Sequence, residues 1–423
     1  MGLSSHRRTL SRPRRSDPVP LAPTDPRPVD RLTTSGTATH AATRAAVMCV
    51  VLACCWQATA RGDEPPSLAQ RVAGRDFPSV FQAWNPADNL AGEPKRTTLA
   101  RHDLVFHAPD FYGLRWIGKH HGLATGFTDA SLAAGRAMRA DLLSRNPNMV
   151  LLAEVRYRDA HASHLPADHQ WWLRQEGKIV PGWEEGGYFR LDVANPAFRA
   201  QVARQAKAVV ESGVCDGIML DWWDDDDDRL ALVREIRAAI GDAPLILANA
   251  NHRRTPRTAE FLNGYFLECY QTESAEDWKT IADTLRWAES QLRPPRVNCL
   301  ETWHHGSRQD LRRMRATTTM ALTLSDGYCL FSDPNPLPAP DHLHDWYPFW
   351  NEPLGRPLGQ GARHADGSVR REFDGGLVVY NPPGNGPVEI EVDAPSTSAA
   401  TRAVGRRFRI EDGDGDLLLL SAE

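Results

Sequence analysis

The sequence predicts a (β/α)8 barrel followed by a small all-β domain. A chain of 423 residues suits a barrel of about 250 residues plus a smaller module. Short apolar runs of β-branched and aromatic residues alternate with helical patterns, which is typical of βα units around a parallel sheet. Eight runs are expected to form strands, at residues 77–84, 104–108, 149–157, 216–222, 244–250, 265–270, 296–303 and 327–332. An open doubly wound sheet is the alternative, but no G-x-G-x-x-G follows a strand and no Walker A loop occurs.

The first 60 residues are expected to lie outside the fold. Residues 1–45 are rich in Arg, Pro, Ser and Thr and are predicted to be disordered. Residues 45–55 read AAVMCVVLACC, an apolar run of signal-peptide length that is too short to span a bilayer, and Ala58-Thr59-Ala60 resembles a cleavage site. We therefore expect export to the periplasm or the medium, with Cys54 as a candidate lipid anchor. The true start codon and the cleavage site stay open.

The segments between the expected strands carry helix signals, and residues 61–353 are assigned to the barrel domain. Phe198, Val202, Ala206 and Val209 keep helical spacing and stop at Gly213. A second helix, from Leu230 to Ile240, stops at Gly241 in the same way. Ser274-x-x-Asp277 and Ser307-x-x-Asp310 resemble capping boxes, which predict two further helix starts.

The pattern changes after residue 353. Short strands are expected at 369–373, 377–380, 388–392, 406–410 and 416–420, separated by Gly, Pro, Asn and Asp turns. This spacing is typical of a small antiparallel module, so residues 354–423 are assigned to a β-sandwich-like domain.

Charge and cysteine usage exclude several function classes. The first 60 residues hold eight Arg and three Asp, which leaves 41 basic and 51 acidic residues, a net charge of −10, in residues 61–423. Because a domain with this much negative charge repels a phosphate backbone, we do not expect the protein to bind nucleic acid. Cys215, Cys269, Cys299 and Cys329 show no C-x-x-C spacing and are expected to be buried core residues. No cofactor or metal is predicted, and the oligomeric state stays open.

Polar and aromatic residues gather at the C-terminal ends of the expected strands, where catalytic groups of such barrels lie. Burying an unpaired carboxylate costs free energy, so carboxylates at several strand ends indicate a function. Paired carboxylates are what glycosidic cleavage uses, one as proton donor and the other as nucleophile or base. The candidate substrate-binding residues are Trp84, Glu154, Trp222, Trp223, Asn249, Glu301, Trp303, His304 and Asp333.

Asp221 and Glu268 are the candidate catalytic pair. Each residue ends an apolar run that is expected to form a strand. Inward-pointing residues of alternate barrel strands share one layer, so the two carboxylates could face one substrate. Asp216 opens the same strand as Asp221 at the opposite end and is expected to be structural. The run Asp224–Asp228 follows this strand and is expected to be a solvated loop, with a calcium site as the alternative.

Trp84, Trp222, Trp223 and Trp303 lie at strand ends, where flat rings could face sugar C–H groups. Core packing is the alternative for about half of the tryptophans in these regions.

The motifs DGIMLDWW (216–223), FLNGYFLECYQ (261–271), REFDGGLVVYNP (371–382) and FRIEDGDGDLLLL (408–420) resemble the hypothetical glycosyl hydrolase family fifteen. A more distant likeness is to the endo-α-1,4-polygalactosaminidase family. The resemblance covers most of residues 77–423. It implies a (β/α)8 barrel, Asp221 as nucleophile, Glu268 as acid/base and therefore a retaining mechanism, with no redox cofactor. It carries little information on the sugar or the linkage.

We therefore predict a glycoside hydrolase acting on a poly- or oligosaccharide. A non-catalytic carbohydrate-binding barrel is the alternative from another class. A metal-dependent amidohydrolase is disfavoured, because it needs an H-x-H at the first strand, which here ends Gln82-Ala83-Trp84-Asn85. The pairs His304-His305 and His342-x-His344 are expected to be surface or hydrogen-bonding histidines.

Overall fold

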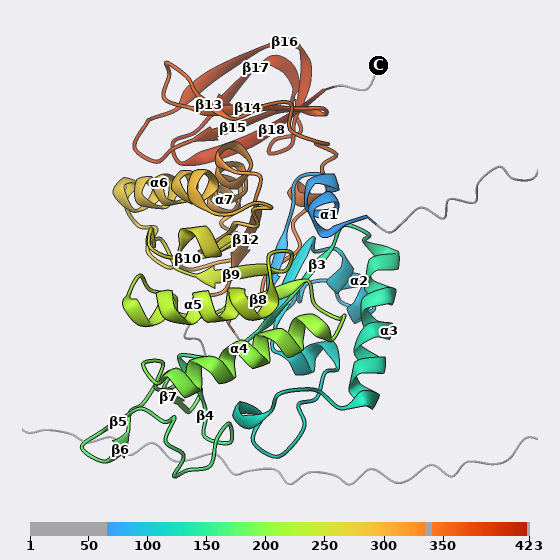
Figure 1. Cartoon of the computed structure of the whole chain (residues 1–423). Helices are drawn as coiled ribbons and strands as arrows, with labels where there is room; N and C mark the ends of the chain where they lie inside the picture. The colour runs from blue at the N-terminus through green and yellow to red at the C-terminus, as the bar shows by residue number, and fades with distance from the viewer. Residues whose placement is uncertain (1–65, 335–340, 421–423) are drawn as a thin grey trace, which may run out of the picture. The chain divides into compact units, whose positions relative to one another are not determined.

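The computed structural model describes residues 66–334 and 341–420, which belong to one compact unit. The predicted signal segment and Cys54 lie outside these residues. All eight expected barrel strands are confirmed, as one parallel sheet in sequential order (Figure 1). A parallel bridge between Val80 and Cys329 joins the first and last strands, so the barrel is nearly closed. The strands are β1 (Phe81–Ala83), β2 (Leu104–His107), β3 (Val150–Glu154), β8 (Gly217–Leu220), β9 (Leu245–Asn249), β10 (Gly264–Cys269), β11 (Cys299–Trp303) and β12 (Tyr328–Ser332).

Helices connect most of these strands on the outside of the barrel. They are α1 (Leu68–Gly74), α2 (Lys95–Ala100), α3 (Asp129–Arg145), α4 (Pro196–Glu211), α5 (Asp227–Ile240), α6 (Ala275–Gln291) and α7 (Leu311–Leu324). Short 3₁₀ turns are η1 (Pro109–Tyr112), η2 (His121–Leu123), η3 (Ala259–Phe261) and η4 (Pro348–Asn351). The predicted stops of α4 and α5 are confirmed: Gly213 and Gly241 have positive φ angles just beyond the two helices.

The capping prediction is right at one helix and wrong at the other. Ser274 and Asp277 form the predicted reciprocal box at the start of α6. Helix α7 instead begins at Leu311, and Asp310 is its N-cap because its side chain accepts a hydrogen bond from Arg313 N. Ser307 lies before the helix, where its hydroxyl accepts from Gln309 N.

Two connections differ from a regular βα repeat. Strand β9 is joined to β10 by the turn η3, without an α-helix. Between β3 and α4 the chain inserts two small antiparallel sheets of two strands each. One pairs β4 (Asp159–His161) with β7 (Tyr188–Arg190), and the other is the hairpin of β5 (Arg174–Gln175) and β6 (Lys178–Ile179). The insertion follows β3 directly, so it belongs to the barrel end where the candidate residues lie.

Aromatic rings fill the barrel interior below these strand ends. The ring centroids of Phe81, Phe106 and Phe266, from three different strands, lie 5.1 to 6.0 Å apart. Trp84 packs edge-on against Phe106 at 4.9 Å. This apolar floor excludes water, which raises the cost of any charge placed above it.

The C-terminal strands form one six-stranded antiparallel sheet in the order β13-β14-β15-β18-β16-β17. The strands are β13 (Ala362–Arg363), β14 (Val369–Phe373), β15 (Gly376–Asn381), β16 (Val388–Ser398), β17 (Val404–Ile410) and β18 (Asp414–Leu420). Helix α7 packs between this sheet and the barrel, and Arg315 in α7 makes a two-pronged ion pair with Asp414 at 2.9 and 2.7 Å. A Cβ at Gly415 would overlap the Thr319 hydroxyl, so glycine allows the close approach of β18 to α7. The domain limits at 61–353 and 354–423 stay predictions.

Four cysteines of the described part, Cys215, Cys269, Cys299 and Cys329, are buried and unpaired, as expected for core residues. Among the described residues, no helix has the length and hydropathy needed to cross a bilayer.

Candidate active site

The ends of β8, β9 and β10 bring Asp221, Asn249 and Glu268 together. The Asn249 side-chain amide donates one hydrogen bond to Asp221 Oδ1, at 2.8 Å, and one to Glu268 Oε2, at 2.7 Å. Since both bonds end at one nitrogen atom, their sum limits the separation of the two carboxylate oxygens to about 5.5 Å. The two carboxylates therefore face one small space at the barrel mouth.

The surroundings of the two carboxyl groups differ. Asp221 Oδ1 also accepts from Trp222 N, at 3.0 Å. Burial raises the pKa of Asp221, while the Arg156 guanidinium, the Asn249 amide and the Trp222 amide oppose the shift. Burial also raises the pKa of Glu268, to about 7, and although His342 opposes the shift, Glu301 and Asp221 add to it. Glu268 is thus about half protonated at neutral pH and mostly protonated below it, as a general acid must be at its working pH.

Glu154, at the end of β3, lies beside Asp221, because β3 pairs directly with β8. Its carboxylate accepts a hydrogen bond from Trp84 Nε1 at 3.1 Å and lies 3.0 Å from Arg156 Nε. Burial raises the pKa of Glu154 to about 7 against the effect of Arg156, and the Asp221 carboxylate adds to the rise. A small cleft here is lined by Glu154, Val155, Arg156, Tyr157, Arg158, Asp159, Asp221 and Trp222.

Glu301 and His342 lie behind Glu268. Glu301 is next to Glu268 in register on β11 and is fully buried, with hydrogen bonds from Ser332 Oγ at 2.6 Å and His342 Nδ1 at 2.9 Å. Glu268, Glu301 and His342 each offer one atom within 4.8 Å of the others, a spacing that could admit a cation. His342 Nδ1 already forms a hydrogen bond with Glu301 Oε1, at 2.9 Å, and His342 Nε2 faces Glu268, so the three side chains contact one another without a metal ion.

Aromatic side chains surround the mouth. Trp222 and Tyr270 are each 44% exposed, and the ring centroids of Tyr270 and Trp303 lie 6.0 Å apart. Trp303 also donates to Glu301 from its indole nitrogen, at 3.3 Å. Trp223 is fully buried and donates to Thr258 Oγ1, so its ring is closed to a ligand in this structure.

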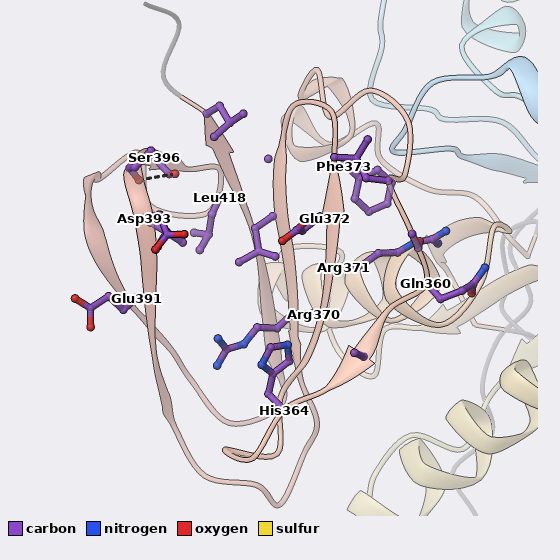
Figure 2. A pocket seen from close by; sticks show the side chains of 18 residues that line it. Gln360, His364, Arg370, Arg371, Glu372, Phe373, Glu391, Asp393, Ser396 and Leu418 are labelled. Atoms are coloured by element: carbon purple, nitrogen blue, oxygen red, sulfur yellow. Dashed lines mark hydrogen bonds between the residues drawn. The ribbon is translucent and has the colours of Figure 1, made fainter.

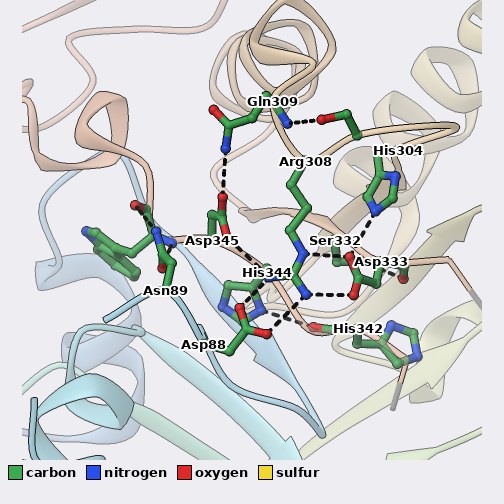
Figure 3. Close-up of polar contacts among 12 residues, drawn as sticks. Asp88, Asn89, His304, Arg308, Gln309, Ser332, Asp333, His342, His344 and Asp345 are labelled. Atoms are coloured by element: carbon green, nitrogen blue, oxygen red, sulfur yellow. Dashed lines mark hydrogen bonds and ion pairs between the residues drawn. The ribbon is translucent and has the colours of Figure 1, made fainter. Parts of the chain in front are cut away.

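His304 and Asp333 are occupied in a second polar cluster (Figure 3). Arg308 donates a hydrogen bond to each carboxylate oxygen of Asp333, both at 2.6 Å, and it also contacts Asp88 and Asp345. His304 Nε2 lies 2.9 Å from Asp333 Oδ1. This cluster attaches the segment after β12 to the rim of the barrel.

The backbone is strained around the mouth. Six described non-glycine residues have positive φ angles, and Trp84, Trp222, Asn251 and His342 are four of them. Such conformations cost about 1–3 kcal/mol each and gather at active sites. All four follow barrel strands, and Trp84, Trp222 and His342 lie beside the candidate carboxylates.

The run Asp224–Asp228 is accounted for without calcium. Asp226 is the N-cap of α5, and Asp227 and Asp228 lie in its first turn, where negative charge favours the helix dipole. Asp224 and Asp227 form ion pairs with Arg253 and Arg257.

A hollow of about 580 Å³ lies on the C-terminal sheet (Figure 2). Its arginines are already paired, Arg370 with Asp366 and Arg371 with Asp326. It holds no convergent set of carboxyl groups, so the barrel mouth is the better candidate.

No family model matches the chain, and no curated protein matches it. Solved structures resemble it at low identity. A noncanonic maltogenic α-amylase, AmyB from Thermotoga neapolitana, aligns with a TM-score of 0.51 and 11% identity over 82% of this chain and 99% of that one. An α-amylase from Lactobacillus plantarum aligns with a TM-score of 0.50 and 12% identity over 84% of this chain and 100% of that one. These likenesses agree with the barrel fold; the family predicted from sequence motifs stays a prediction.

Proposed function

We propose that this protein is a glycoside hydrolase that cleaves an O-glycosidic bond of a poly- or oligosaccharide. The observation that carries the proposal is the pair of carboxylates, Asp221 and Glu268, held by one Asn249 amide at the barrel mouth. Two carboxyl groups that face one space, one of them with its pKa raised to about 7, are what glycosidic cleavage requires.

Asp221 acts as the nucleophile and Glu268 as the acid/base. Glu268, with its pKa raised to about 7, donates a proton to the leaving oxygen. The Asp221 carboxylate attacks the anomeric carbon as that bond breaks, giving a covalent glycosyl ester. Glu268, now ionised, takes a proton from water, and the water oxygen displaces Asp221 from the sugar.

The separation of the two groups favours retention of configuration. Retaining enzymes hold the carboxyl groups about 5–5.5 Å apart, whereas inversion needs about 6.5–9.5 Å to admit water. Because Asp221 Oδ1 and Glu268 Oε2 are at most about 5.5 Å apart, these two oxygens are closer together than inversion requires. We therefore expect the first product to have the anomeric configuration of the substrate, as seen by proton NMR before mutarotation. Product of the opposite configuration would exclude Asp221 as a nucleophile.

Further residues of the mouth are assigned to substrate binding. Trp222 and Trp303 offer ring faces to the sugar, and Glu154 offers a carboxyl group to its hydroxyls. Asn249, predicted to bind substrate, instead has both of its amide hydrogens on Asp221 and Glu268. Trp84 orients Glu154 through its indole N–H. Glu301, His304 and Asp333 support the mouth from behind: Glu301 contacts His342, and Asp333 contacts Arg308 and His304.

The competing function is a barrel that binds carbohydrate without cleaving it. Glycan-array binding, followed by product analysis of each bound glycan, distinguishes the two. We expect new reducing ends from at least one bound glycan. Binding without new reducing ends between pH 5 and 7 would favour the binding protein.

Asn249→Ala tests the shared amide. The change removes the donor that favours the ionised forms of Asp221 and Glu268, so we expect kcat to fall about 10- to 100-fold. Asn298→Ala is the matched control: Asn298 is equally buried but bonds Glu289 and Tyr265 N at the other end of the barrel. It should lower thermal stability with little change in kcat. Equal losses of kcat in both variants would assign Asn249 a purely structural role.

A further inference from the structure

His342 lies between carboxylates on both of its ring nitrogens. Its Nδ1 is 2.9 Å from Glu301 Oε1, and its Nε2 is 3.8 Å from Glu268 Oε1 and 3.6 Å from Asp341 Oδ2. A neutral imidazole has one N–H and one lone pair, so one nitrogen would turn its lone pair toward an anion. Only the imidazolium presents an N–H to both sides.

The structure holds this ring in one place. His342 has a φ of 57°, and its ring lies 5.1 Å from the Trp84 ring and 6.0 Å from Phe266. The flanking chain is attached to β12, since Asp333 N donates to Leu343 O at 2.8 Å, and to the end of α2, through His344 and His102. Figure 3 shows His342 beside this anchored segment. Strained backbone conformations of this kind cluster at functional sites, so the fixed and buried position of His342 indicates a role in function.

The charges facing His342 are anionic. Glu301 comes from β11, Glu268 from β10 and Asp341 from its own segment, while β1 and the barrel floor contribute the apolar rings of Trp84 and Phe266. Burial alone would lower the pKa of His342, but the three carboxylates outweigh it and raise the pKa to about 10. His342 in turn lowers the proton affinity of Glu268.

We propose that His342 is a positioning residue, whose imidazolium is fixed by Glu301 and sets the orientation and proton affinity of Glu268. This inference rests on the proposed function. Glu268 must give up a proton in the first step and take one back in the second, so its affinity has to stay near working pH. Burial without the cation would keep Glu268 protonated and slow the second step.

The first test is independent of turnover and uses the full chain labelled with ¹⁵N-histidine. At pH 8.5 an unperturbed histidine is neutral. We expect an imidazolium NMR signal at this pH that is lost in His342→Asn, which assigns it to His342. A neutral His342 at pH 8.5 would overturn the proposal, and so would a His342 signal that moves on addition of Zn²⁺, because the three residues would then be metal ligands.

The second test is the pH–rate profile of His342→Asn on a glycan that the wild type cleaves. Without the cation, the alkaline limb should move up by about one pH unit or more, and kcat below the limb should fall. His305→Asn is the control, because His305 is partly exposed and contacts Thr272 and Glu273. It should leave the profile unchanged.

An unmoved limb in His342→Asn would overturn the proposal. Should that variant not fold, the wild-type NMR measurement still decides the charge of His342. If the proposed function itself is wrong, the wild type will cleave no glycan, whatever the charge of His342. That result is distinct from an unmoved alkaline limb.

Discussion

Asp221→Asn should abolish turnover while the protein stays folded. The amide cannot form the glycosyl ester, so kcat should fall roughly a thousandfold or more, as expected when a nucleophile is removed. Stability should change little, because Asp221 is partly exposed at the mouth and its Asn249 partner keeps a second bond, to Glu268. Steady-state kinetics and thermal unfolding of the same preparation measure the two effects.

Asp216→Asn is the matched control within the same strand. Asp216 precedes β8 at the opposite end of the barrel, where its buried carboxylate pairs with Arg71 and Arg139 and accepts from Leu151 N at 2.9 Å. Breaking such a buried pair costs about 3–5 kcal/mol. We expect a lower melting temperature with kcat nearly unchanged. The reverse pattern, with activity lost at Asp216 and kept at Asp221, would move the chemistry to another site.

The rate of the wild type should fall as the pH rises through about 7, because that is the pKa of Glu268 and only the protonated form can act as the acid. In Glu268→Gln this alkaline limb should disappear, and kcat on a substrate with a poor leaving group should fall about 10²–10⁴-fold. Azide should restore part of the rate on an activated substrate, since it attacks the glycosyl ester without a base.

Glu154→Gln is the control for this profile. Glu154 is buried, and its pKa is also raised to about 7, so it could produce a similar limb. We expect Glu154→Gln to weaken substrate binding and to keep the alkaline limb. A limb that vanishes in Glu154→Gln and persists in Glu268→Gln would exchange the roles of the two residues.

Strand periodicity was enough to predict the barrel. The eight apolar runs each needed a buried strand, and the positions that end them, among them Asp221 and Glu268, had to meet at one barrel end. Asn249 was expected to bind substrate, but its bond to both carboxylates depends on side-chain geometry that a residue pattern does not contain.

Other features depend on contacts between distant segments. Trp223 is next to Trp222 in sequence, yet the Trp223 side chain is buried while the Trp222 side chain is exposed. The difference depends on the hydrogen bond from Trp223 to Thr258 and on the positive φ angle of Trp222. His342 was expected to be an ordinary histidine, and no local motif marks it. Its position after the last barrel strand was the one available signal, because loops there belong to the active-site end.

The most direct test of Asp221 as the nucleophile is to trap the glycosyl ester. The wild type would be incubated with a deactivated fluorosugar of the type identified by the glycan screen, then digested and mapped by mass spectrometry. The retaining mechanism predicts one added sugar mass, on the peptide that contains Asp221, and none in Asp221→Asn. A label on Glu154, Glu268 or Glu301, with Asp221 unmodified, would contradict the assignment of Asp221.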